Sequence, residues 1–335
     1  MTEISDGSTL KTRAHELVHR TQLLRQEIAK SIIGQEELVE HLLLALFSGG
    51  HVLLEGLPGL GKTLLVKTLA ECLGLESSRI QFTPDLMPAD VTGTRVIEDH
   101  EGNRAFRFQK GPIFSNLVLA DEINRATPKT QSALLEAMQE ASVTVANSTF
   151  ELARPFSVIA TQNPIELEGT YPLPEAQLDR FLFKLDVRTP SEDELVRVLD
   201  STTGDVSPQC EAVLSGSELM EIQGIARQIL CGEHLLRYVA ALVLATHPEP
   251  SAEAQTQRLV RFGASPRAGQ AIILTAKVRA LLDGRPCVSR EDIDATTLPS
   301  LRHRVVLSFE ADAEGLGVTE LLAGWRQQAE KALKG

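Results

Sequence analysis

A short glycine-rich segment, residues 56–63, carries the residue types best suited to bind a phosphorylated ligand. It reads Gly-Leu-Pro-Gly-Leu-Gly-Lys-Thr and fits the pattern G-x-x-x-x-G-K-[ST]. In this pattern the glycines let backbone N–H groups close around phosphates, Lys62 reaches the β- and γ-phosphates, and the Thr63 hydroxyl takes one position on Mg²⁺. An apolar run precedes the segment and a helical pattern follows it, which favours a nucleotide site over an unrelated glycine-rich turn. The residues predicted to contact the nucleotide here are Gly56, Pro58, Gly59, Leu60, Gly61, Lys62, Thr63 and Leu64.

Two acids, Asp121 and Glu122, follow a second apolar run, Leu117 to Ala120. Such an ending places a carboxylate beside Mg²⁺ at the carboxyl edge of a parallel sheet. Asp121 would hold the metal through water, and Glu122 would polarise or orient the attacking water as a general base. Many strands end in solvated acids, but this pair lies about 60 residues after the glycine-rich segment. That spacing favours the catalytic interpretation.

Three further polar residues suit phosphate chemistry. Asn163, in Thr-Gln-Asn-Pro, ends the next apolar run, where its amide could reach a γ-phosphate or the attacking water. An Asn-Pro turn explains the same residues equally well. Arg180 lies beside another predicted strand, and Arg267 begins a helix far along the chain. Guanidinium groups suit phosphate oxygens, although by position alone each arginine also fits a surface ion pair.

Short apolar runs separated by helical or irregular stretches are the elements that must position these groups. The runs predicted as strands are His51 to Glu55, Ile80 to Phe82, Leu117 to Ala120, Ser157 to Thr161 and Phe181 to Val187. Helical periodicity is found at Thr9 to Lys30, Glu36 to Phe47 and Lys62 to Leu73. Strands between helices predict an α/β fold with an open, mainly parallel sheet. Thr94 to Phe108 is predicted to form an inserted β-hairpin, either a plain surface excursion or a partner-contacting element.

The composition of the chain shifts after Val187, which predicts a second domain. Ser191 and Glu194 form a capping box at the start of the new helical region. We expect a core domain over residues 1–188 and an all-helical domain over residues 189–335. The helices predicted in the second domain are Leu219 to Leu230, Leu235 to Thr246, Ala268 to Leu282, Arg290 to Thr297 and Thr319 to Lys334.

The 335 residues include 43% hydrophobic and 23% charged residues, which suits a globular chain with one large or two medium cores. The net charge of -12 argues against non-specific binding to nucleic acid or anionic membranes. No apolar run approaches the length of a membrane span, and the first residues do not resemble a signal peptide. The four cysteines lack zinc-site spacing. We therefore expect a cytoplasmic protein with reduced thiols.

Taken together, these motifs resemble an AAA+ ATPase and, more narrowly, the MoxR family. The resemblance runs in order from about residue 25 to about residue 310 without large gaps. It rests on Ile33 to Glu36, Gly56 to Thr63, Gln81 to Thr94, Ala120 to Arg125, Thr130 to Glu140, Thr161 to Pro164, Leu178 to Phe181 and Gly263 to Arg267. It implies a five-stranded parallel AAA+ P-loop core, a helical lid domain, and ATP and Mg²⁺ as cofactors.

The resemblance also implies a role for each motif. Lys62 and Thr63 would bind phosphate and Mg²⁺, with Asp121 as the Mg²⁺-binding acid and Glu122 as its catalytic Walker B neighbour. Asn163 would be sensor 1, Arg180 an arginine finger that reaches a neighbouring subunit, and Arg267 sensor 2. Ile33 and Gly34 would lie near the adenine. Members of the family form rings, usually hexamers, with each nucleotide between two subunits.

Family members act as chaperone-like remodelling or maturation factors for protein clients, often alongside proteins with von Willebrand factor A domains. The family pattern implies that the hairpin at Thr94 to Phe108 faces the pore side of the ring. Its tip here, Asp99 to Asn103, is polar and partly acidic.

Three alternative functions compete with an ATP-hydrolysing ring. One is a nucleotide-binding scaffold in which ATP only drives assembly, and the intact Glu122, Asn163 and Arg180 argue against it. A DNA-associated AAA+ ATPase would use the basic residues of the hairpin region, although the chain as a whole is acidic and carries no added nucleic-acid module. A magnesium-chelatase-like motor subunit is the nearest alternative, and the residues leading into the hairpin fit it less well.

Overall fold

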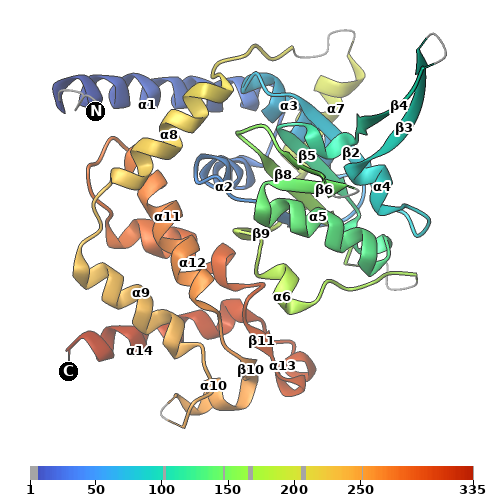
Figure 1. Cartoon of the computed structure of the whole chain (residues 1–335). Helices are drawn as coiled ribbons and strands as arrows, with labels where there is room; N and C mark the ends of the chain where they lie inside the picture. Colours follow the sequence, from blue (N-terminus) through green and yellow to red (C-terminus); the bar gives the residue numbers. More distant parts are fainter. Residues whose placement is uncertain are drawn as a thin grey trace.

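A computed structural model describes residues 7–100, 103–145, 148–164, 169–204, 209–250 and 252–334 of the chain. A layered α/β core contains the blue-to-green part of the chain, and a group of helices in yellow to red lies beside it (Figure 1). Within the described residues, no helix combines the length and apolar character needed to span a membrane. The predicted boundary between residues 188 and 189 stays a prediction.

The core is built on a five-stranded sheet with the order β2-β5-β8-β1-β9, and all neighbouring strands run parallel. The strands are β1 (Val52–Glu55), β2 (Ser77–Gln81), β5 (Leu117–Asp121), β8 (Ser157–Gln162) and β9 (Phe183–Asp186). The predicted parallel sheet is therefore confirmed. The predicted strand at Ile80 to Phe82 begins earlier in the structure, at Ser77, and ends at Gln81.

Helices cover both faces of the sheet, which explains why its central strands are apolar on both sides. Successive residues of β1 enter different clusters: Val52 and Leu54 pack with α2 and α3, whereas Leu53 packs with α5. The helices of the core are α1 (Gly7–Ala29), α2 (Glu36–Phe47), α3 (Lys62–Cys72), α4 (Pro88–Thr92), α5 (Pro128–Glu140) and α6 (Glu175–Leu178). Short 3-10 turns follow at Pro112–Phe114 and Ile123–Arg125.

Two antiparallel hairpins project from the sheet. The predicted hairpin is confirmed as β3 (Gly93–His100) and β4 (Asn103–Lys110). A second hairpin, β6 (Ser142–Val145) and β7 (Ser148–Glu151), was not predicted. The two hairpins touch, because the rings of Phe108 and Phe150 stack with centroids 4.1 Å apart and the Arg95 guanidinium donates to the Ser148 hydroxyl (2.7 Å).

The C-terminal region is helical, as predicted, with one addition: β10 (Val260–Phe262) and β11 (Val306–Leu307) form a short antiparallel pair. Its helices are α7 (Glu192–Thr203), α8 (Gly216–Gln228), α9 (Glu233–Ala245), α10 (Ala254–Leu259), α11 (Pro266–Leu282), α12 (Arg290–Leu301), α13 (Phe309–Glu314) and α14 (Val318–Lys334). The predicted capping box at α7 forms, with the backbone N–H of Ser191 donating to Glu194 (2.7 Å). Apart from α7, the helices of the C-terminal region share one apolar cluster with α1 to α3 of the core.

Candidate functional site

The glycine-rich segment links β1 to α3 with a backbone that side chains would disturb. Gly59 and Gly61 have φ values of 84° and 75°, in the left-handed region that favours glycine. A Cβ on Gly56 would lie 2.8 Å from the Cβ of Val187, so this residue must stay small. α3 begins at Lys62, and its N-cap residue Gly61 provides no side-chain cap. The first N–H groups of α3 can thus donate hydrogen bonds to a bound anion.

Lys62 folds back onto this loop. Its ammonium group donates to the carbonyl oxygens of Gly56 (2.7 Å) and Leu57 (3.1 Å). Burial lowers the pKa of Lys62, while the nearby charges of Asp121 and Glu122 act in the opposite direction. The ammonium group therefore donates to neutral acceptors that phosphate oxygens can replace. The loop fits the phosphates of a nucleoside triphosphate.

The Asp121 carboxylate is buried at the end of β5 and held on both oxygens. The Thr161 hydroxyl donates to Oδ1 (2.7 Å), and the Arg79 guanidinium donates to Oδ2 (2.6 Å). The Thr161 hydroxyl also accepts the backbone N–H of Glu122 (2.8 Å). One side chain on β8 thus orients both members of the acid pair.

Glu122 has a backbone conformation that is rare for a residue with a side chain. Its φ of 56° and ψ of 50° lie in the left-handed region, and functional sites are where such strain is commonly retained. The carboxylate accepts hydrogen bonds from the amide of Gln81 (2.9 Å) and the guanidinium of Arg125 (3.2 Å). The turn thus aims the carboxylate toward β2 and the end of the sheet.

Sequence reasoning missed Arg79 and Gln81 on β2, and it passed over Thr161. Arg79 also donates to the Gln81 side chain (2.5 Å), so the two residues link the partners of Asp121 and Glu122. The available signal was the alternation of polar residues in the strand Ser77–Gln81, whose partners depend on which strand lies beside it.

Asn163 is buried directly after β8, at the same edge of the sheet. β8 lies between β1 and β5, so Asn163 comes between the phosphate loop and the acid pair. The structure therefore brings together the predicted loop, Asp121, Glu122 and Asn163 at the carboxyl edge of neighbouring strands.

The predicted metal ligands are the Thr63 hydroxyl and the Asp121 carboxylate. Among the described residues, no group of three or more His, Cys, Asp and Glu side chains gathers to form a metal cage. Mg²⁺ typically binds one or two protein oxygens and completes its shell with water and substrate phosphates. The Thr63 hydroxyl and the Asp121 carboxylate, beside a phosphate loop, are a ligand set of this kind.

Arg180 and Arg267 lie together at the opposite edge of the sheet. Both line a cavity of about 310 Å³ that also contains Gly50 and His51, the residues just before β1. In the parallel pair of β1 and β9, Val52 is opposite Phe183, so Arg180 precedes the strand whereas Gly56 follows it. The intervening strand spans about 13 Å at 3.3 Å per residue. These arginines do not meet the phosphate loop of their own chain.

Asp179 anchors this second cluster. Its Oδ1 accepts hydrogen bonds from the Ser265 hydroxyl (2.8 Å) and the Arg304 guanidinium (2.8 Å), and its Oδ2 lies 3.7 Å from Arg267. Arg180 donates to the carbonyl oxygen of Leu135 (2.7 Å). Residues of the C-terminal region thus hold the segment between α6 and β9 that carries Arg180.

Gly34, predicted near the adenine together with Ile33, lies where the core meets α7. Gly34 has a φ of 72°, and a Cβ there would lie 2.5 Å from the Glu194 carboxyl carbon. The Arg188 guanidinium donates to the Gly34 carbonyl (2.7 Å) and to Glu194 (2.7 Å). That guanidinium lowers the pKa of Glu194 to about 2.

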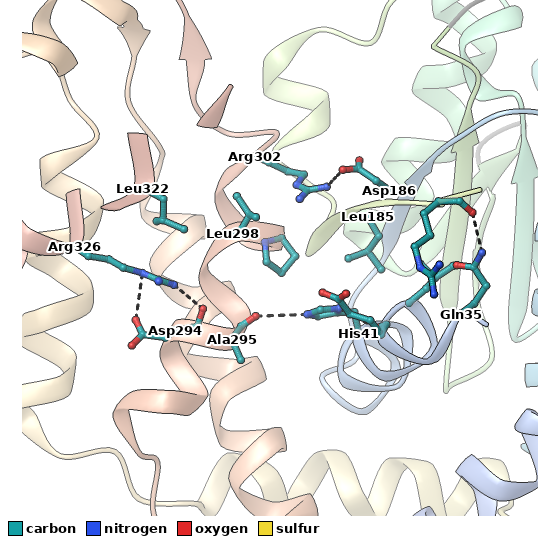
Figure 2. Close-up of a pocket in the computed structure, with 14 residues that line it drawn as sticks. Gln35, His41, Leu185, Asp186, Asp294, Ala295, Leu298, Arg302, Leu322 and Arg326 are labelled. Carbon is teal, nitrogen blue, oxygen red and sulfur yellow. Dashed lines mark hydrogen bonds and ion pairs between the residues drawn. The ribbon is translucent and has the colours of Figure 1, made fainter. Parts of the chain in front are cut away.

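A cavity of about 440 Å³ opens between the core and the C-terminal helices, next to this region (Figure 2). It begins at Gln35 and is lined by residues of α2, β9, α12 and α14. Arg302 forms an ion pair with Asp186, and Arg326 donates to the Asp294 carbonyl (2.8 Å). No residue of the phosphate loop lines this cavity, so it is separate from the phosphate site.

Comparisons with known proteins agree with this geometry. The family model described as "ATPase family associated with various cellular activities (AAA)" matches residues 51–183, and the AAA lid domain model matches residues 252–322. The chain is 47% identical to Chaperone MoxR1 of Mycobacterium tuberculosis, covering 89% of this chain and 78% of that protein. It is 33% identical to Protein MoxR of Methylorubrum extorquens, covering 84% and 86%. A crystal structure of a candidate ATPase from Cytophaga hutchinsonii has a TM-score of 0.90 at 38% identity, covering 96% and 97%.

Proposed function

Since this chain belongs to the MoxR family of AAA+ ATPases, we propose that it hydrolyses ATP in a Mg²⁺-dependent ring and uses that hydrolysis to remodel protein clients. The observation that supports the ring is the separation of Arg180 and Arg267 from the phosphate loop of the same chain. Two copies placed head to tail would bring one copy's arginines to the other copy's nucleotide. Such a contact leaves a free loop edge and a free arginine edge, so repetition forms a ring when the rotation between copies closes.

Each residue then has a task at the shared site. Lys62 and the first amides of α3 hold the phosphates, and Thr63 and Asp121 hold Mg²⁺. The metal supplies neutralisation of charge on the phosphate oxygens. Glu122 orients the attacking water and takes its proton, while Asn163 holds the water or the γ-phosphate. Arg180 and Arg267 of the neighbouring copy stabilise the charge that develops during transfer.

Complementation between two inactive variants tests this arrangement. Glu122→Gln and Arg180→Ala should each hydrolyse ATP very slowly on their own. After mixing and reassembly in equal amounts, about one contact in four pairs an intact Glu122 with an intact Arg180, so activity should return to roughly a quarter of the parent rate. No recovery in mixed assemblies would show that both residues serve the same chain's nucleotide, and the shared site would be wrong.

The β3–β4 hairpin offers a surface for protein clients. Ile97 and Phe106 are directly opposite each other in the hairpin register and are 61% and 73% exposed. Opposed apolar side chains of this kind form one patch, and exposed apolar patches mark interaction sites. The sequence suggested a polar tip; the exposed pair below it supports client contact. The name of the relative Chaperone MoxR1 agrees with this part of the proposal.

A trapping experiment tests the client role and the proposed partner with a von Willebrand factor A domain. The Glu122→Gln variant should hold ATP and retain bound proteins, and Ile97→Asp with Phe106→Asp should reduce that retention at least tenfold. Thr94→Asp, another exposed position on the hairpin, is the control. Equal retention by both hairpin variants would exclude the Ile97–Phe106 patch as the client surface.

A further inference from the structure

α7 differs from the other long helices because it buries nothing. Among the described helices of ten or more residues, it alone has no buried side chain. Leu195, Val196 and Leu199 are 45%, 59% and 53% exposed. Their spacing of one, three and four residues puts them on one side of the helix. We call these three residues the α7 ridge.

The base of α7 is nevertheless firmly held. Ser191 and Glu194 form the capping box, and the Arg188 guanidinium ties Glu194 to the Gly34 carbonyl. Val187, five residues before the helix, would touch a Cβ placed on Gly56 of the phosphate loop. The ridge is therefore an exposed apolar surface on a helix whose base is held beside the phosphate loop.

We propose that the α7 ridge is the docking surface for a second copy of this chain. The ridge of one copy would pack against the cavity beside Arg180 and Arg267 of the other. The proposal rests on the proposed function, in which the site is incomplete until a neighbour supplies these arginines. A copy that brings them to the phosphate loop must cover the edge from which α7 projects. The ridge is the apolar surface that this approach would bury.

The two surfaces are chemically compatible. The cavity of about 310 Å³ that contains the arginines also has an apolar lining. Its apolar members are Met138, Leu182, Ala271 and Leu274. A projecting apolar ridge on one edge and a partly apolar hollow on the other suit a head-to-tail contact.

Charge favours the same pairing. The exposed charged residues of α7 are acidic except for one arginine. They are Glu192, Asp193, Arg197 and Asp200. The hollow is bordered by Arg180 and Arg267 against Asp179, which is already held by Arg304 and Ser265. An acidic helix approaching a basic hollow is electrostatically favoured, and a nucleic acid would instead be repelled by α7.

Assembly of ridge variants tests the proposal. In the Glu122→Gln parent with ATP and Mg²⁺, Val196→Asp with Leu199→Asp should raise the protein concentration needed for assembly at least tenfold by light scattering after gel filtration. ATP binding by the dissociated chain should stay within about twofold, because neither residue lies in the phosphate loop. Leu236→Asp with Leu244→Asp, at exposed positions on α9, is the matched control and should assemble like the parent.

The outcomes distinguish a wrong docking surface from a wrong ring. If the ridge variant assembles at the parent's concentration while mixed Glu122→Gln and Arg180→Ala subunits recover activity, the docking surface is wrong and the shared site stands. If the parent itself stays monomeric with ATP bound, both the ring and the docking surface are overturned. Assembly lost in the α9 control as strongly as in the ridge variant would also overturn the assignment to α7.

Crosslinking identifies the opposite side of the contact. Leu199→Cys and Gln270→Cys, the second at an exposed position lining the arginine cavity, are placed in separate chains with Cys287→Ser. With ATP, mild oxidation by diamide should yield a covalent dimer in the mixture and far less with either chain alone. Here the two thiols lose two hydrogens to diamide and form one disulfide. Dimers from Leu199→Cys alone would indicate a two-fold contact and overturn the head-to-tail seating.

Discussion

The carboxyl and amino edges of the central sheet are constructed differently. At the carboxyl edge, Lys62 rests on backbone carbonyls and Glu122 lies in a strained turn, so both groups are ready for a ligand. At the amino edge, Arg304 is almost fully buried and donates to acceptors on four residues. These acceptors belong to Asp179, Phe181, Leu182 and Ser300. One edge is prepared to bind, whereas the other is a rigid support that presents Arg180 and Arg267 outward.

The largest effect that separates the two edges should come from Arg180→Ala. Loss of an arginine that stabilises phosphoryl transfer lowers turnover by on the order of 10³-fold. ATP binding by the dissociated chain should be unchanged, because Arg180 is remote from its own chain's loop. Steady-state phosphate release and nucleotide titration measure the two quantities, with Lys129→Ala, exposed on α5, as the control. A matching loss of ATP affinity in the dissociated chain would place Arg180 at its own nucleotide, and the two edges would then share one site.

Thr161→Val should have the next largest effect, at the carboxyl edge. The substitution keeps the shape of the side chain but removes the hydroxyl that contacts both Asp121 and the backbone of Glu122. We expect turnover to fall on the order of tenfold to a hundredfold, in line with a lost positioning group for general base catalysis. Thr161→Ser retains the hydroxyl and should restore most of the rate. If Val and Ser behave alike, the hydroxyl does not position the acid pair.

The rigid amino edge should also make stability sensitive to acid. Burial lowers the pKa of His51 to about 4 from 6.5, while its ring accepts the Val158 N–H and contacts the Met138 carbonyl. Between these pH values His51 binds a proton in the unfolded chain but stays neutral in the folded chain. Stability is therefore full above pH 6.5 and is lost as the pH falls toward 4, by about 2 kcal/mol between pH 7 and pH 5.

Denaturant unfolding at several pH values measures this slope. His51→Asn should flatten it, whereas His234→Gln, at an exposed position, should leave it unchanged. Burial likewise lowers the pKa of His303 well below its usual value, so part of the slope persists in the His51 variant. If His51→Asn leaves the pH dependence of the unfolding free energy unchanged, protonation of His51 does not destabilise the fold.

The smallest effect should come from Arg302→Ala, a substitution in the cavity between the core and the C-terminal helices (Figure 2). The ion pair of Arg302 with Asp186 is partly exposed, so Arg302→Ala should change the unfolding free energy by less than about 1 kcal/mol. Turnover should stay within about twofold, since neither edge site is touched. A loss of several kcal/mol would mean that this pair, rather than the cluster around Asp179, holds the two regions together.

The hairpins show where sequence prediction succeeded and failed. β3 and β4 were predicted because apolar residues flank a turn-rich segment, and the pairing extends over eight residues in each strand. β6 and β7 have four residues each and few large apolar side chains, so their pattern is too short to distinguish from a loop. Their pairing is stabilised by contacts such as Phe150 on Phe108, which depend on another part of the chain.

The carboxyl-edge site was largely predictable. Loop glycines, a lysine, strand-ending acids and Asn163 each follow an apolar run, and parallel strands place all such endings at one edge. Arg79 and Gln81 were not predictable, because the prediction of β2 relied on its apolar residues. Their role exists only because β5 is the neighbouring strand. Strand order is a tertiary property.

The sequence by itself determined the local chemistry: a phosphate loop, an acid pair and arginines suited to phosphate, each specified by neighbours a few residues away. Only the tertiary structure decided which groups share a site. Arg180 lies before its strand and the loop lies after its own, so the parallel direction of β1 and β9 puts them at opposite edges. Arg267 joins Arg180 through Asp179, although the two arginines are far apart in the chain. Distances between such segments depend on packing of the whole chain, which no local pattern encodes.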